Sequence, residues 1–163
     1  MPETESRSRA RPSPLLVLVA LVLVGSPTLA EPMKVASDSM SPTYSAGDEV
    51  LVVKVGVRSH RPRKGDVVVL RAPGSGELMV KRVVALGGES VGIRDGVLVV
   101  RNRPVVESFV DHSRVDGTHF GPVHVPRHTV WVLGDARAGS RDSRQFGPVP
   151  QEAIVGRVLL RLW

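Results

Sequence analysis

The chain has 163 residues, a formal net charge of +6, no cysteine and only 4% aromatic residues. The absence of cysteine excludes disulfide frameworks and thiolate metal sites. The basic residues are not interleaved with aromatic ones, as a stacking surface for bases requires, so we expect no nucleic-acid partner. The length allows one domain of ordinary size after a separate N-terminal segment.

The first element in chain order is an N-terminal segment directed to a membrane. Residues 1–13 are polar and carry three arginines, and residues 14–30 contain no charge. This length is at the lower limit of about 17 residues for a spanning helix, and the ending Thr28-Leu29-Ala30 also fits a cleavable signal peptide. We favour an anchor over a cleaved signal. Because basic flanks stay inside, residues 1–13 are expected in the cytoplasm and residues 31–163 outside it.

Beyond Met33 the sequence consists of short valine-rich runs separated by turn residues, a pattern typical of a mainly β fold. Asp95-Gly96 is a strong signal for a hairpin turn. Residues 102–128 and 134–150 are rich in proline, glycine and charge and are expected to be loops. The predicted strands are 49–55, 66–71, 78–85, 90–93, 97–101, 129–133 and 154–162.

The charged and metal-binding residue types give weak signals outside these strands. The basic run 58–64 fits a solvated loop, with contact to lipid headgroups as the second interpretation. His119, His124 and His128 fall in a predicted loop without the carboxylate or paired-histidine spacing of a metal site. We therefore expect no bound metal.

Three segments carry residue types suited to catalysis: 37–43, 81–89 and 134–147. Alone, the first fits a polar linker, the second an edge-strand lysine that faces water, and the third a solvated loop with local ion pairs. Lys81, however, follows an apolar run inside a predicted strand. Burial there would lower the pKa of its amine and allow it to accept a proton near neutral pH.

Taken together, in this order and after a membrane segment, the three segments resemble bacterial type I signal peptidases. That family shows S-x-S-M-x-P-T around its nucleophile, K-R-V-V-x-x-x-G around its lysine and G-D-N-R-x-x-S-x-D-S-R-x-x-G near its C-terminus. All three patterns are legible here, and the resemblance extends to about Gly156. It implies antiparallel coiled sheets behind an N-terminal transmembrane helix.

The resemblance assigns roles position by position. Ser39 corresponds to the nucleophile and Lys81 to the general base. Ser37 corresponds to the hydroxyl that forms an oxyanion hole with the Ser39 backbone N–H, and Ser140 to the serine that orients the lysine amine. The further positions that are expected to shape the site are Met40, Pro42, Asp135, Asp142 and Arg144. For Asp142 and Arg144, a plain ion pair is an equal alternative.

Two departures from the family pattern stand out. Ala136 replaces the asparagine that usually follows Gly-Asp, which removes a side-chain amide from that loop. Gly87-Gly88 stands where Pro-Gly is usual, which affects mainly the rigidity of the turn. Neither departure changes the serine or the lysine.

The resemblance implies a membrane-bound serine endopeptidase that removes N-terminal signal peptides from exported preproteins by acyl transfer. It would be a monomeric, single-pass protein of the cytoplasmic membrane, in contact with lipid, with its catalytic domain outside the cytoplasm and no cofactor. Two alternatives stay open: a specialised maturation peptidase of the same fold that acts on one secreted protein, and a non-catalytic exported β domain. A self-cleaving protein of the SOS-repressor type would carry a DNA-binding helical domain before the serine, where this chain has a membrane segment.

Overall fold

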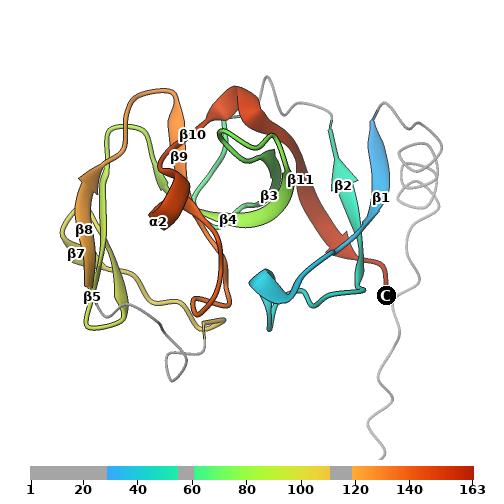
Figure 1. Ribbon diagram of the computed structural model, residues 1–163, viewed down its shortest axis with the longest axis horizontal. Coiled ribbons are helices and arrows are strands. Elements are labelled where there is room, and N and C mark those ends of the chain that lie inside the picture. The colour runs from blue at the N-terminus through green and yellow to red at the C-terminus, as the bar shows by residue number, and fades with distance from the viewer. Residues whose placement is uncertain (1–28, 55–60, 111–118) are drawn as a thin grey trace, which may run out of the picture.

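The computed structural model describes residues 29–54, 61–110 and 119–163, which form two antiparallel sheets (Figure 1). The mainly β class predicted from the sequence is confirmed. In spatial order, the larger sheet contains β1 (Ala30–Lys34), β2 (Glu49–Val53), β11 (Ile154–Arg161), β3 (Val67–Arg71), β4 (Leu78–Leu86), β9 (Thr129–Leu133) and β10 (Val149–Pro150). The smaller sheet contains β7 (Arg103–Pro104), β6 (Val97–Val100), β5 (Ser90–Arg94) and β8 (His119–His124).

In the described part of the chain, three short helices lie between these strands. They are η1 (Asp38–Met40), α2 (Ser143–Phe146) and η3 (Gln151–Ala153). Within the described ranges, no helix has the length and apolar character needed to span a membrane.

Strand β3 explains how valine runs build this core. Val67 and Val69 point into one apolar cluster, and Val68 and Leu70 point into another. Successive strand residues face opposite sides of a sheet, so a strand covered on both faces is apolar at every position. The two clusters fix β3 in the middle of the larger sheet.

A third apolar cluster joins the two sheets. Trp131 and Leu133 of β9 pack against Val91 and Leu98 of the smaller sheet. The rings of Phe120 and Trp131 lie 5.6 Å apart between centroids. The smaller sheet is therefore fixed to the part of the larger sheet that carries β9 and the loop after it.

The larger sheet is strongly coiled, as Figure 1 shows for β11, β3 and β4. Irregular pairing occurs along β11, between Ile154 and Gly156 and between Val158 and Leu160. Such irregularities bend a strand and increase its twist. A side chain at Gly156 would place its Cβ 2.4 Å from Val52 Cγ1, so the close approach of β11 to its neighbour β2 requires glycine.

Several elements differ from the sequence prediction. Strands β1, β7, β8 and β10 were not among the predicted strands, and α2 and β10 fall in the stretch 134–150 predicted as loop. Strand β8 contains Gly121 and Pro122, which normally mark a loop. Short edge pairings of this kind depend on tertiary packing rather than on local pattern.

The predicted C-terminal end of the membrane segment, residue 30, is also wrong. Ala30 lies in β1, is 1% exposed and pairs with Val53, so it is part of the β domain and not of a helix. The remainder of that prediction, up to residue 28, lies outside the described residues, as does the basic tail 1–13.

Candidate active site

Ser39 lies on η1, a single helical turn between β1 and β2. Met40 is fully buried in an apolar cluster and anchors the turn. The Asp38 carboxylate accepts a hydrogen bond from the backbone N–H of Ala46 at 2.9 Å, and the Ser41 N–H donates to the Asp38 carbonyl. These contacts hold the turn rigidly and leave the Ser39 hydroxyl accessible.

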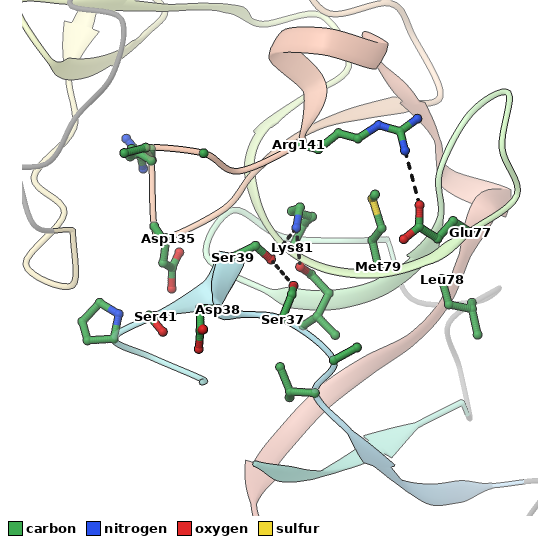
Figure 2. A pocket seen from close by; sticks show the side chains of 18 of the residues that line it. Ser37, Asp38, Ser39, Ser41, Glu77, Leu78, Met79, Lys81, Asp135 and Arg141 are labelled. Carbon is green, nitrogen blue, oxygen red and sulfur yellow. Dashed lines mark hydrogen bonds and ion pairs between the residues drawn. The ribbon is translucent and has the colours of Figure 1, made fainter. Parts of the chain in front are cut away.

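Lys81 reaches Ser39 from the middle of β4. Its side chain is buried, with 3% of the residue exposed. The amine Nζ lies 2.7 Å from Ser39 Oγ and also donates to the Val80 carbonyl at 3.1 Å. Figure 2 shows Ser37, Ser39 and Lys81 linked in this way at the centre of the site. The pair is 42 positions apart in sequence and is assembled only by the fold.

Burial lowers the pKa of the Lys81 amine below its ordinary value, because a buried ammonium loses its hydration. The carboxylates of Asp142, Glu77 and Asp135 act in the opposite direction, since they favour the charged form. The net direction is downward. A buried amine beside a hydroxyl is the arrangement that allows a lysine to act as a general base.

A loop after β9 supports Ser39 from the other side. The backbone N–H of Ala136 donates to the Ser39 carbonyl at 3.1 Å. A Cβ on Gly134 would lie 2.5 Å from the Ser39 carbonyl oxygen and 2.1 Å from Ser140 Oγ, so only glycine allows this approach. The loop therefore packs directly on the backbone of Ser39.

Asp142 closes this loop and begins α2. Its side chain accepts from the backbone N–H groups of Arg144 and Gln145. The Gln145 side chain accepts from the Asp142 N–H in return, which completes a capping box between Asp142 and Gln145. Asp142 also accepts from the Gly134 N–H at 3.0 Å and pairs with Arg144 Nε at 2.9 Å. One buried carboxylate thus joins the two ends of the loop.

Asp135 binds the loop to β4. The guanidinium of Arg82 makes two hydrogen bonds to the Asp135 carboxylate, at 2.6 and 2.8 Å, and Thr43 Oγ1 donates to the same carboxylate at 2.5 Å. Bidentate pairs of this kind are both strong and directional. The three residues connect the serine turn, the lysine strand and the loop.

Comparison with known proteins confirms the family that the sequence resembles. Residues 11–163 match the family described as signal peptidase, peptidase S26. The chain belongs to the signal peptidase family.

Individual members of the family resemble the chain over most of its length. It is 34% identical over 157 residues to a probable signal peptidase I-1 of Synechocystis, covering 91% of this chain and 79% of that protein. It is 36% identical over 156 residues to thylakoidal processing peptidase 1 of Arabidopsis thaliana, covering 89% of this chain but only 45% of that protein. The crystal structure of a signal peptidase I from Enterococcus faecalis superimposes with a TM-score of 0.55 at 28% identity, covering 62% of this chain and 98% of that one.

The structure of this signal peptidase brings together most of the residues predicted for the site. Ser37 Oγ lies 3.3 Å from Ser39 Oγ. Met40 and Pro42 belong to the same turn, Met40 on its buried side and Pro42 at the edge of the groove. Asp142 and Arg144 form the ion pair that was the plainer of their two interpretations, and through it they also shape the loop.

Ser140 does not make the expected contact. Its hydroxyl is buried and has no hydrogen-bond partner among residues 29–54, 61–110 and 119–163, so the predicted bond to the Lys81 amine is absent. The hydroxyl instead packs against Gly134, and the amine donates to the Val80 carbonyl.

Sequence analysis missed three residues that hold the signal peptidase site together: Thr43, Arg82 and Arg137. Thr43 and Arg82 stand inside the motifs that identified Ser39 and Lys81. A signal was available for Arg82, because neighbours in a strand face opposite sides and Arg82 must therefore point away from Lys81. Arg137 was read as part of a solvated loop, yet it is 1% exposed.

The site lies in a groove of about 1160 Å³. Its walls include residues 33–37, which lead to Ser39, and residues 77–80, which lead to Lys81. Among the described residues, β1 pairs only with β2, and residues 78–81 of β4 pair only with β3. Each wall of the groove therefore presents a strand edge with unpaired backbone groups.

Charged residues occur at the rim of the groove. Glu77 and Arg141 form an exposed ion pair of 3.3 Å beside Met79 (Figure 2). No group of three or more metal-binding side chains occurs among the described histidine, aspartate and glutamate residues.

Proposed function

We propose that this signal peptidase uses Ser39 as its nucleophile and Lys81 as its general base to remove N-terminal signal peptides from exported preproteins. The observation that carries the proposal is the 2.7 Å contact between a buried lysine amine and a serine hydroxyl at the floor of an open groove. This is the pairing of nucleophile and base that acyl transfer requires.

The first half of the reaction forms an ester. The neutral Lys81 amine takes the Ser39 proton while Oγ attacks the carbonyl carbon of the scissile peptide bond. The C–N bond then breaks, and the Lys81 ammonium gives its proton to the departing amine. The substrate stays attached to Ser39 as an acyl-enzyme.

The second half releases the acyl group. Water attacks the ester carbonyl while the Lys81 amine takes a proton from it, and that proton returns to Ser39 Oγ as the ester bond breaks. The Ser39 N–H and the Ser37 hydroxyl, whose oxygen lies 3.3 Å from Ser39 Oγ, would donate to the oxyanion in both steps. Such donors are worth about 3–4 kcal/mol each where they have been measured.

The substrate would bind as an extended strand between the two walls of the groove. Strands β1 and β4 run in the same direction, because four successive antiparallel pairings separate them. A peptide laid between them can satisfy unpaired backbone groups on both sides by strand addition. This mode needs little from substrate side chains, as suits exported proteins of varied sequence.

The membrane placement follows from the sequence. Residues 14–28 would anchor the protein in the cytoplasmic membrane, with residues 1–13 inside and the β domain outside in contact with lipid. Ten residues separate Thr28, the end of the proposed anchor, from Ser39, which limits their distance to roughly 40 Å. The site would therefore lie close to the bilayer surface, where substrates emerge. The protein would act on them as a monomer.

The test is incubation of the purified full-length protein in detergent with a preprotein, followed by mass measurement of the products. We expect one cut after a small residue, and no cut by the Ser39→Ala variant, which should fold as the wild type does. A wild-type protein that leaves every preprotein intact would favour the non-catalytic β domain. Cleavage of a single member of a preprotein panel would favour the specialised maturation peptidase.

A further inference from the structure

Residues 105–110, here called the 105–110 segment, follow β7 of the smaller sheet. They extend to the loop 134–142 after β9, here called the catalytic loop because it packs on Ser39. In Figure 1 this is the yellow chain that runs from the smaller sheet toward the orange loop after β9. Val105 packs on the cluster between the sheets, and its N–H donates to the Leu98 carbonyl at 2.8 Å. Val110 is 7% exposed, and its N–H donates to the Glu107 carbonyl. Both ends of the segment are therefore fixed.

Glu107 makes a buried ion pair with the catalytic loop. Its Oε2 lies 2.6 Å from Nη2 of Arg137, and the two side chains are 3% and 1% exposed. Arg137 Nε donates to the Gly134 carbonyl at 3.1 Å, and in the described part of the chain Nη1 has no partner. A buried guanidinium needs a partner of opposite charge, so Glu107 determines where Arg137 can lie.

Phe109 makes a second contact with the same loop through Arg82. The Arg82 guanidinium carbon lies 4.0 Å from the centre of the Phe109 ring, a cation–π geometry. Arg82 in turn holds the Asp135 carboxylate with two hydrogen bonds. The 105–110 segment thus reaches the loop at two points, through Asp135 and through Arg137.

Ala136 lies between these two points and contacts the nucleophile residue. Its N–H donates to the Ser39 carbonyl at 3.1 Å. The Ser39 backbone carries the proposed oxyanion donor, and its side chain must stay within reach of the Lys81 amine. A shift of the loop would therefore change the geometry of the reacting groups, and a displacement of about 1 Å can cost roughly a hundredfold in rate.

We propose that Glu107 is a positioning residue that holds Ser39 in register with Lys81 by fixing the loop 134–137. The inference rests on the proposed function for its kinetic part, because a reaction must exist for positioning to affect it. It assigns the smaller sheet a role in catalysis, since that sheet delivers the 105–110 segment to the site.

The experiment compares full-length Glu107→Gln, Glu107→Asp and Ser108→Ala in detergent. Ser108 is an exposed neighbour of Glu107 and serves as the matched control. Activity on a preprotein gives kcat and KM, and amide hydrogen exchange reports Ala136 N–H and the strand amide of Val83, which donates to Asp66. We expect Glu107→Gln to lower kcat by about 10–100-fold with KM within twofold. Ala136 exchange should accelerate while Val83 stays protected, Glu107→Asp should recover much of the rate, and Ser108→Ala should match the wild type.

Two outcomes would overturn the proposal. One is a wild-type kcat in Glu107→Gln; the other is faster exchange at Ala136 and Val83 alike, which would mean a general loss of stability. If Glu107→Gln does not fold, Arg137→Lys keeps the positive charge but removes the Nη2 group that Glu107 binds. In that variant, unchanged kcat and unchanged Ala136 exchange would contradict the proposal.

The exchange measurement needs no substrate. It therefore tests the positioning of the loop even if the wild type cleaves nothing, and failure of the proposed function can be told from failure of this inference.

Discussion

Lys81 and Arg82 are neighbours in β4, yet their cationic groups lie on opposite faces of the strand. The Lys81 amine contacts Ser39 Oγ at 2.7 Å, whereas the Arg82 guanidinium binds Asp135 at 2.6 Å. The alternation of a strand separates the two cations, and Asp135 neutralises one of them. The motif Lys-Arg therefore supplies a buried amine, the proposed general base, on one side and a structural ion pair on the other.

The pH dependence of cleavage should show the lowered pKa of Lys81. Only the neutral amine can accept the Ser39 proton, so kcat/KM should rise with pH through an apparent pKa below the ordinary lysine value of about 10.4. Initial rates with a preprotein from pH 5 to pH 10 measure it. If an active variant that lacks Lys81 showed the same rise of kcat/KM with pH, at the same apparent pKa, the titration would belong to another group.

The lowered pKa also affects stability. The unfolded chain binds the Lys81 proton more tightly than the folded one, so stability should rise with pH between the folded and unfolded pKa values. Lys81→Met removes this penalty. Its melting temperature should exceed that of the wild type near neutral pH, and the difference should shrink as pH approaches 10. A difference that is constant over this range would contradict the assignment.

Ser39 and Lys81, the proposed nucleophile and base, should act as one unit. Ser39→Ala and Lys81→Met should each reduce preprotein cleavage by at least about a thousandfold, and the double variant should be little worse than either single variant. Single-turnover assays at high enzyme concentration can measure the residual rates. Losses that multiply in the double variant would show that the two side chains work independently.

Gly134→Ala tests the close approach of the loop to the nucleophile. The added Cβ would lie 2.5 Å from the Ser39 carbonyl and 2.1 Å from Ser140 Oγ, so we expect about 1–3 kcal/mol of lost stability and a large loss of kcat. Denaturant unfolding and kinetics measure the two effects. Adding Ser140→Ala removes the contact with Oγ but leaves the Ser140 Cβ at 2.7 Å and the Ser39 carbonyl at 2.5 Å from the added Cβ. Full recovery in that double variant would mean that the contact with Ser39 is unimportant.

The peptide bond after Ala30, a candidate signal-peptide cleavage site, should stay intact. Ala30 is 1% exposed, pairs with Val53 in β1, and follows Leu29, whose carbonyl accepts from the Lys54 N–H. A protease needs an extended and accessible chain, so this bond is protected once the domain folds. The intact mass of the membrane-extracted protein should include residues 1–30. The control is Ala30→Arg, which lacks the small residue before the candidate cut, and its mass should differ from that of the wild type only by the substitution. A mature N-terminus at Glu31 would contradict the retained anchor.

The strands that the sequence predicted well are those whose pattern is local. Strand β9 was predicted with its observed bounds because residues 129–133 are an apolar run between turn residues. Strand β8 was missed because Gly121 and Pro122 lie inside it, and β1 because it directly follows the apolar N-terminal segment. Pairing with β5 and β2 stabilises these two strands, and neither partner is visible from their own residues.

The candidate site divides in the same way. Ser39 and Lys81 could be assigned because each stands in a motif shared with a known family. The pair Glu107–Arg137 could not, since its members are 30 positions apart and neither has a local pattern that indicates burial. The missing bond from Ser140 is a geometric fact that no motif contains.

The two unpaired strand edges of the groove have a consequence for which proteins can be cut. A strand edge binds backbone N–H and C=O groups, which every chain carries. The groove therefore selects an extended backbone far more than particular side chains. A segment wound in a helix has already used those groups for its own hydrogen bonds. It must unwind before it can lie between β1 and β4, and the ease of that unwinding near the cut would set how quickly different exported chains are released from the membrane.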